Sequence, residues 1–139
     1  MDQDAQRAMK QGTVIVPMLS VRRGARAIAF YEAAFGAEEH YRVESADGTV
    51  VAQMAIEGAE FWLADESPEH LNYSPESLGG GAVRMLLIVA DPDAAFRRAV
   101  AAGAAEVWSV RNEHGWRVGR IVDPFGHHWE IGRPLAETP

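Results

Sequence analysis

The chain has 139 residues, 47% of them hydrophobic, and 13 lysines and arginines against 20 aspartates and glutamates give it a net charge of −7. This length suits one domain with a sizeable core, and the negative charge argues against non-specific nucleic-acid binding. The absence of cysteine excludes disulfides, thiolate nucleophiles and cysteine-ligated metal sites. No apolar run approaches the ~20 residues of a membrane helix, and residues 1–12 lack a secretory apolar segment. We therefore expect a cytoplasmic location and no contact with a membrane.

Acidic residues are concentrated in the first half of the sequence. Between Val43 and Val83 there is no lysine or arginine. The same stretch holds eight acids: Glu44, Asp47, Glu57, Glu60, Asp65, Glu66, Glu69 and Glu76. Two interpretations stay open, a solvated acidic surface or a field that attracts a cationic ligand.

The first predicted element after a polar tail at residues 1–12 is a strand. Residues 13–21 (TVIVPMLSV) are apolar on both faces, which is typical of a strand covered from both sides. Pro17 lies within this run, and it indicates an edge position or a distortion because proline cannot donate to a strand ladder.

A helix and three strands are predicted next, over residues 23–64. The helix at 23–35 ends at Gly36, a residue that tolerates the left-handed conformation closing a helix. Its buried stripe is expected to hold Ile28, Tyr31 and Phe35. The strands that follow are predicted at residues 38–44, 49–57 and 60–64.

Residues 67–81 (SPEHLNYSPESLGGG) predict a linker, because proline, serine and glycine dominate it. The pattern of the first half then returns, about 67–69 residues later. A strand is predicted at 83–90, and Asp91-Pro92 is a helix start with Asp91 as its cap. The buried stripe of that helix is expected to hold Phe96, Ala99 and Val100. The remaining strands are predicted at residues 106–110, 117–122 and 127–132.

The period indicates duplication of one β-α-β-β-β module. The predicted class is α+β, with tandem modules at 13–66 and 82–134 that form a curved eight-stranded cup with helices outside. A short tail is expected at 135–139.

The stretch around the last predicted turn carries the clearest candidate residue. Asp123-Pro124-Phe125-Gly126 has the composition of a tight turn. In the strand after it, side chains alternate between the two faces of the sheet. His128 and Glu130 should therefore share one face, opposite to His127, Trp129 and Ile131.

Four stretches of the sequence resemble one known superfamily. They are Val14–Leu19 (VIVPML), Ala29–Glu38 (AFYEAAFGAE), Asp91–Phe96 (DPDAAF) and Asp123–Glu130 (DPFGHHWE). With the duplicated module, they resemble a bacterial branch, bleomycin-resistance-like or glyoxalase-like, of the vicinal oxygen chelate superfamily. That superfamily includes glyoxalase I, extradiol dioxygenases, fosfomycin-resistance enzymes and bleomycin-binding proteins. The likeness covers about residues 13–134 and implies the cup-shaped fold predicted above.

Enzymes of this superfamily hold a divalent metal with side chains from four cup-facing strand positions. By resemblance these positions fall on Val16, near Trp62, near Met85 and on Glu130. Valine and tryptophan cannot bind a divalent ion, and a thioether is a poor ligand for hard metals. No metal and no cofactor are therefore expected. A shifted metal site is the alternative, in which His40, His70 or His114 would converge on His128 and Glu130.

The predicted cup is apolar and aromatic, with Glu130 as its charged exception. The expected ligand-binding residues are Val16, Met18, Trp62, Met85, Leu87, Trp108, Trp116, His128 and Glu130. Tryptophan in such a cup provides a stacking wall for a flat ligand, or it simply fills the core. Glu130 is expected to hold water, to be hydrogen-bonded by a neighbour such as His128, or to have a raised pKa.

Two classes of function follow. The first is a metal-free protein that binds, and possibly sequesters, a small aromatic or cationic compound, similar to the bleomycin-resistance group. The second is a glyoxalase-like lyase, isomerase or dioxygenase that uses Glu130, its one catalytic candidate, with a non-standard metal site or as a general base. A catalytically silent protein with another ligand stays open as well. A homodimer is expected, because relatives of this fold close their cups by pairing modules within or between chains.

Overall fold

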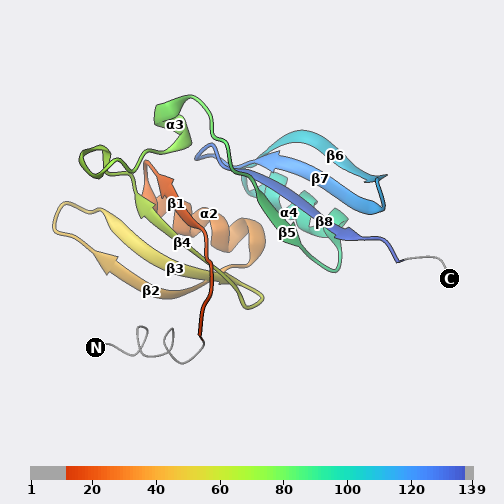
Figure 1. Ribbon diagram of the computed structural model, residues 1–139, viewed down its shortest axis with the longest axis horizontal. Coiled ribbons are helices and arrows are strands. Elements are labelled where there is room, and N and C mark those ends of the chain that lie inside the picture. The colour runs from red at the N-terminus through yellow and green to blue at the C-terminus, as the bar shows by residue number, and fades with distance from the viewer. Residues whose placement is uncertain (1–11, 137–139) are drawn as a thin grey trace.

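The computed structural model describes residues 12–136 as two β-α-β-β-β modules joined by a linker (Figure 1). The predicted α+β class is confirmed. In chain order the elements are β1 (Met18–Val21), α2 (Gly24–Phe35), β2 (Glu38–Glu44), β3 (Val50–Ile56), β4 (Ala59–Asp65), a 3₁₀ helix (Pro68–His70), α3 (Pro75–Leu78), β5 (Met85–Ile88), α4 (Pro92–Ala102), β6 (Ala105–Glu113), β7 (Trp116–Val122) and β8 (His128–Pro134). The predicted terminal tails lie outside the described residues, apart from Gly12, Leu135 and Ala136.

The two modules have the same strand order. Sheet 1 runs β1-β4-β3-β2 and sheet 2 runs β5-β8-β7-β6. In both, the first strand of the module pairs in parallel with the last, and the other pairs are antiparallel. The internal repeat in the sequence is therefore a repeat of topology and pairing direction.

Each helix buries an apolar stripe against its own sheet. In α2 the predicted residues Ile28, Tyr31 and Phe35 are all buried. In α4 the Asp91 carboxylate accepts a hydrogen bond from the Ala94 backbone nitrogen at 3.1 Å, which confirms the predicted cap.

The buried stripe of α4 is narrower than predicted. Phe96 and Ala99 are buried, but Val100 is 39% exposed. Val100 lies next to Ala99 along the chain, about 100° around the helix, and this angle takes it off the covered face.

The modules meet through the faces that the helices cover. α2 packs against α4, and Figure 1 shows each helix behind the strands of its own module. Trp129 of β8 packs against Tyr31 and Phe35 of α2 and against Phe61 of β4, with ring centroids 4.8–5.7 Å apart. One core therefore spans both modules, and aromatic side chains fill its centre.

Asp123 joins the two modules inside this core. Its side chain accepts hydrogen bonds from the Tyr31 hydroxyl at 2.5 Å and from Trp129 Nε1 at 2.9 Å. It also accepts from the backbone nitrogens of Phe125 and His127, at 2.9 and 3.0 Å. Burial, and then the adjacent Asp123 carboxylate, raise the pKa of Tyr31 well above its ordinary value. The predicted turn thus also holds the modules together.

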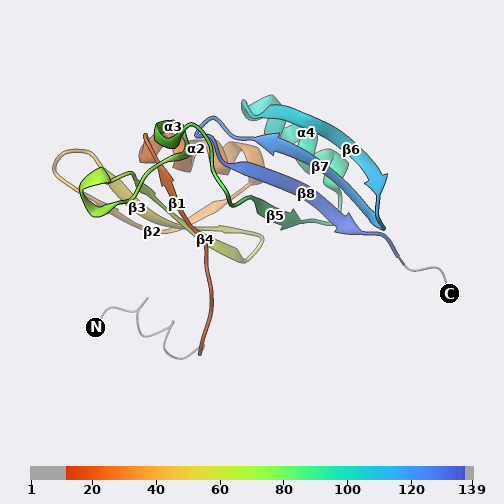
Figure 2. The same cartoon turned by 45° about the horizontal axis from the view of Figure 1, so that its top comes forward.

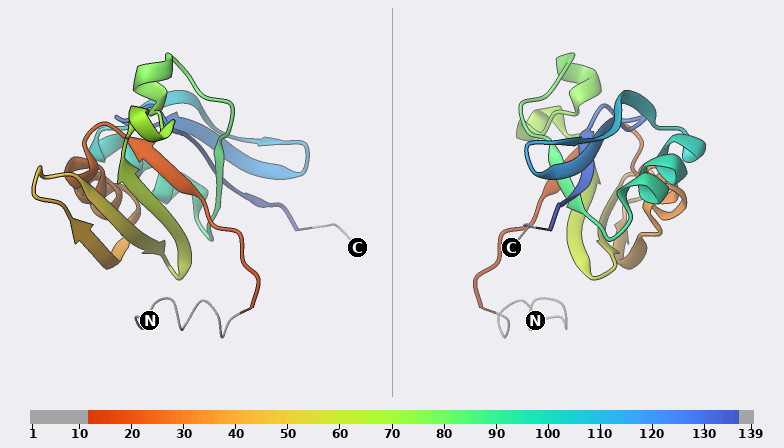
Figure 3. Two further views of the ribbon diagram at one scale, coloured as in Figure 1. Left: turned by 60° about the vertical axis from the view of Figure 1, so that its left-hand side comes forward. Right: turned by 90° about the vertical axis from the view of Figure 1, so that its right-hand side faces the viewer.

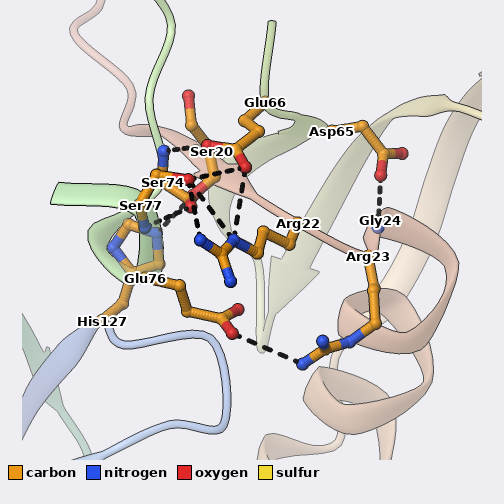
Figure 4. A network of polar contacts seen from close by, with 10 residues as sticks. All are labelled: Ser20, Arg22, Arg23, Gly24, Asp65, Glu66, Ser74, Glu76, Ser77 and His127. Atoms are coloured by element: carbon orange, nitrogen blue, oxygen red, sulfur yellow. Dashed lines mark hydrogen bonds and ion pairs between the residues drawn. The ribbon is translucent and has the colours of Figure 1, made fainter. Parts of the chain in front are cut away.

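The linker contains more structure than predicted. The Ser74 hydroxyl caps the short helix α3 by accepting from the Ser77 backbone nitrogen. Glu66 accepts from the Ser74 backbone nitrogen and from the Ser77 hydroxyl, both at 2.8 Å, and lies 3.5 Å from Arg22 (Figure 4). These bonds, with that from Ser74 first, lower the pKa of Glu66. The linker is therefore fixed against the end of β1.

The first strand is shorter and less covered than predicted. It begins at Met18, and the segment before it leaves the sheet (Figures 2 and 3). Ile15 is 97% exposed and Val14 57%. Only Leu19 and Val21 are buried in the strand, on the side that faces α2. On the other face Met18 is 56% exposed, so the prediction of a strand buried on both faces is wrong. β1 does lie at a sheet edge, as Pro17 indicated.

Candidate functional site

The faces of the two sheets turned away from α2 and α4 carry the candidate site, and we call them the open faces. Side-chain alternation and strand register assign residues to them. The open face of sheet 1 includes Met18, Ser20, Tyr41, Gln53 and Trp62. The open face of sheet 2 includes Leu86, Trp108, Arg120, His128 and Glu130, with Arg84 just before β5.

One row crosses the open face of sheet 1 and is aromatic. Met18 pairs with Trp62, Trp62 with Gln53, and Gln53 with Tyr41. The rings of Tyr41 and Trp62 lie 5.9 Å apart at 60°, an edge-on contact. This row forms a surface of large flat side chains around Gln53, a polar residue that is itself only 8% exposed.

The corresponding row on sheet 2 is charged. Leu86 pairs with Glu130, Glu130 with Arg120, and Arg120 with Trp108. Arg84 Nε donates to Glu130 Oε2 at 2.5 Å, and 20% of the Glu130 side chain is exposed. The expected hydrogen bond from a neighbouring side chain is therefore present, but its donor is Arg84 and not His128.

His128 has a different partner on the same face. Arg120 Nε lies 3.1 Å from His128 Nδ1, which accepts its hydrogen bond. Burial, and then the charge of Arg120, lower the pKa of His128. The side chain is therefore held in the tautomer whose proton lies on Nε2.

Seven of the nine predicted ligand-binding residues lie on the open faces or next to them. Met18 and Trp62 lie on sheet 1, and Val16 lies just before β1. On sheet 2 the open face holds Trp108, Trp116, His128 and Glu130. The predicted alternation in β8 is confirmed, since Trp129 and Ile131 are buried on the opposite face.

Met85 and Leu87 point the other way. In the parallel ladder Met85 pairs with Trp129 and Leu87 with Ile131, so each shares a face with a buried side chain. Leu87 is 8% exposed and belongs to the core. The expectation that these two residues line the cup is wrong by one position of register.

The same shift identifies a different residue at the third expected metal position. Leu86 is the counterpart of Met18, because each pairs with the open-face residue of its module's last strand. Arg84 is then the counterpart of Val16. The four positions hold Val16, Trp62, Arg84 and Glu130, and a guanidinium is no ligand for a cation. This donor set does not fit a divalent metal.

The alternative of a shifted metal site has no support in the described part of the chain. No three acidic or histidine side chains among residues 12–136 converge in a way that could hold a metal ion. His40 contacts Glu38, His70 contacts Ser67, and His114 lies in the turn between β6 and β7, near Glu113.

Comparison with known proteins agrees with this geometry. Residues 17–132 match the family described as a glyoxalase-like domain. The chain belongs to this family. It is thereby a member of the glyoxalase, bleomycin-resistance and dioxygenase superfamily that its sequence resembles.

Several relatives of this glyoxalase-like protein span most of its length. An uncharacterised protein of Mycobacterium tuberculosis is 42% identical over 127 residues, 88% of this chain and 75% of the relative. The X-ray structure of an Arabidopsis thaliana gene product is 31% identical, with a TM-score of 0.65 over 90% of this chain and 97% of that one. TnmS3, an antibiotic binding protein from Streptomyces, is 24% identical, with a TM-score of 0.63 over 88% and 98%. The likeness to TnmS3 concerns the fold alone.

Six of the open-face residues named above were not predicted from sequence: Ser20, Tyr41, Gln53, Arg84, Leu86 and Arg120. Gln53 carries a usable signal, since it is a polar residue within an apolar strand. Arg84 and Arg120 could have been found by counting alternation from Glu130, but that count requires the strand register. No helix in residues 12–136 is long and apolar enough to cross a membrane.

Proposed function

We propose that this glyoxalase-like protein is a metal-free binding protein for a small aromatic compound, which it sequesters rather than converts. The observation that carries the proposal is which residues occupy the four positions where related enzymes hold a metal ion. Valine, tryptophan, and an arginine paired with a glutamate replace a chelating set, and Tyr41 packs its ring against that of Trp62. Flat ligands bind such surfaces by stacking. Antibiotic binding by TnmS3 indicates that the fold is compatible with this role.

The charge of the ligand is constrained by Glu130. A cationic compound would have to compete with Arg84 for this carboxylate, because the two already form an ion pair. A cation that displaced Arg84 would gain a partly desolvated carboxylate. We therefore propose an aromatic ligand, and whether that ligand also carries a positive charge is tested separately.

We further propose that a second copy completes the cup. Met18, Leu86 and Ile88 are 56%, 53% and 58% exposed on the open faces and Val16 is 38% exposed just before β1. These side chains lie on or just before β1 and on β5, one edge strand of each sheet, and exposed apolar side chains of this kind are found in protein interfaces. The aromatic row of one copy would then face the charged row of the other, and a homodimer would enclose two equal sites.

The test is titration calorimetry with aromatic compounds, including bleomycin-like and intercalator-like drugs, on wild type and two variants. Trp62→Ala should weaken binding by about 0.5–1.5 kcal/mol, or about two- to twelvefold, since stacking is lost. Glu130→Gln should matter only for cationic ligands. Leu71→Ala, at an exposed linker position, is the matched control. Equal affinity of a ligand for wild type and Trp62→Ala would place binding elsewhere.

An enzyme remains the second candidate for one reason. Arg84 occupies Oε2 of Glu130, while Oε1 has no hydrogen-bond partner among residues 12–136. A general base needs such a free carboxylate oxygen. Mass spectrometry of the ligand after incubation separates the two functions, because a binding protein returns it unchanged. Conversion that is lost in Glu130→Gln would establish a lyase or isomerase instead.

A further inference from the structure

A cavity lies where the linker crosses between the modules. It has a volume of about 340 Å³. Its walls are the segment Pro17–Ser20, the linker between Tyr73 and Met85, and the facing ends of β7 and β8. In Figure 1 the linker runs from α3 to β5 across this region. Trp62 and Glu130 do not line it, but Met18, Ser20, Arg84, Arg120 and His128 do. The cavity therefore adjoins the open-face site proposed above and shares these residues with it.

The charge of the cavity is opposite to that of the chain. Arg84, Arg120, His127 and His128 line the cavity, and no aspartate or glutamate does. Arg84 is paired with Glu130 next to the cavity, so Arg120 is the cavity's main source of positive charge. The whole chain has a net charge of −7. A basic cavity in an acidic protein selects anions, because the surrounding surface repels them and only this region attracts them.

Hydrogen-bond donors remain free inside the cavity. Arg120 uses Nε for His128, and its two terminal nitrogens have no partner among the described residues. His128 accepts that bond at Nδ1, so its Nε2 proton can be donated to a ligand. A guanidinium with two free NH₂ groups binds a carboxylate or phosphonate through two parallel hydrogen bonds.

His127 has a structural role at the same place. Its Nε2 lies 2.9 Å from the Ser20 carbonyl oxygen and donates to it. This contact ties the turn after β7 to β1. Gly126 in that turn approaches the linker so closely that a Cβ atom would lie 2.8 Å from Pro75 Cβ. With the bonds among Arg22, Glu66 and Ser77 (Figure 4), these contacts form the cavity wall before a ligand arrives, which lowers the entropic cost of binding.

The rest of the lining is apolar. Met18, Leu78 and Val83 contribute hydrocarbon surface, and Leu78 and Val83 are 64% and 79% exposed. A ligand body placed there would remove this surface from water. We propose that the cavity binds a small organic anion, with its carboxylate or phosphonate on Arg120 and His128 and its apolar body against the linker.

The experiment uses one molecular shape with three charges. Benzoate, benzamide and benzamidine share a phenyl ring and differ in having an anionic, neutral or cationic head. Calorimetric titration of the full chain should show binding of benzoate, and of phenylphosphonate, in preference to benzamide and benzamidine. Arg120→Gln should weaken the anion affinity about tenfold or more, because a charged pair of hydrogen bonds is lost.

Three further variants fix the interpretation. Arg120→Lys keeps the charge and should retain more affinity than Arg120→Gln. Leu78→Trp leaves the charges intact, fills the cavity and should also weaken binding. Arg26→Gln, at an exposed position of α2 outside the cavity, removes the same charge and should have no effect on binding. Thermal melting checks that all four variants are folded. The proposal is wrong if neither anion binds, or if both bind equally well to Arg120→Gln and Leu78→Trp. Benzamidine binding that depends on Trp62 would instead report on the open-face site.

Discussion

The two modules have one topology and opposite surface chemistry. Each row across an open face has four counterpart positions, set by the same ladder of paired strands. Sheet 1 places Met18, Trp62, Gln53 and Tyr41 there, and sheet 2 places Leu86, Glu130, Arg120 and Trp108. Duplication therefore preserved the scaffold, while the side chains on the open faces diverged into an aromatic half and a charged half.

The modules also differ in how their turns are used. Asp47, in the turn between β2 and β3 of the first module, bonds only Thr49 and is exposed. Asp123, between β7 and β8 of the second module, is buried and bonds Tyr31 of the first module. The same residue type thus has a local role in one module and joins both modules in the other.

The largest expected effect comes from removing Asp123. Asp123→Ala would leave the Tyr31 hydroxyl, the Trp129 ring nitrogen and two backbone nitrogens without an acceptor in the core. We expect the free energy of unfolding, measured by urea denaturation, to fall by about 3 kcal/mol or more. Asp47→Ala is the control and should cost much less. Similar losses in both variants would show that Asp123 is only a turn residue.

Dimerisation through the open faces can be tested by introducing a charged residue among their exposed apolar side chains. Leu86→Glu should convert the expected homodimer to a monomer at micromolar concentration in light scattering, because a carboxylate would be buried at the interface. Leu71→Glu, on the exposed linker, should leave the mass unchanged. A wild-type protein that is itself monomeric at this concentration would refute the dimer.

An alkaline pH profile sharpens the role of Tyr31. Its folded pKa is raised, so the folded state keeps the phenolic proton above about pH 10, where the unfolded chain loses it. The contribution of Tyr31 to the free energy of unfolding should therefore be constant below that pH and should decrease above it, by up to about 1.4 kcal/mol per pH unit. The chain has one lysine, so few other groups titrate there.

Two tyrosine variants separate this effect from general alkaline unfolding. Tyr31→Phe should be less stable than wild type at pH 8 but should lose the additional decrease above pH 10. Tyr73→Phe, which alters a partly exposed hydroxyl on the linker, should retain it. An unchanged slope in Tyr31→Phe would assign the decrease to other groups.

The smallest signal is expected in the metal content of the purified protein, which should be near zero. Purified wild-type protein should contain no stoichiometric zinc, nickel, manganese or iron by plasma mass spectrometry, because Val16, Trp62 and Arg84 cannot chelate. About one metal ion per chain would contradict the proposed function.

Metal binding by designed variants can test whether Arg84, and not Met85, is the counterpart of Val16. A variant with Val16→His, Trp62→Glu and Arg84→His restores a ligand at each counterpart position beside Glu130, and it should take up zinc. The matched variant with Met85→His in place of Arg84→His should not, since Met85 faces the core. Uptake by the second variant alone would restore the register first predicted from the sequence.

The sequence alone determined the fold of this glyoxalase-like protein. The period of 67–69 residues, the helix stripe through Ile28, Tyr31 and Phe35, and the cap at Asp91 are local or repeating signals. Each depends on neighbours within a few residues or on comparison of the two halves, so no long-range contact is needed to interpret them. The inward direction of Trp129 and the outward direction of Glu130 follow from alternation within one strand in the same way.

The tertiary structure decided the rest, because register between distant strands is not encoded in any one of them. A shift of one residue in β5 exchanges its two faces, and it replaces Met85 by Arg84 beside Glu130. The partner of Asp123 is Tyr31, 92 residues away, which no turn composition could indicate. The basic cavity likewise arises only where the linker, β1 and the start of β8 come together. These contacts join segments far apart in sequence, and folding alone brings their charges within reach of one another.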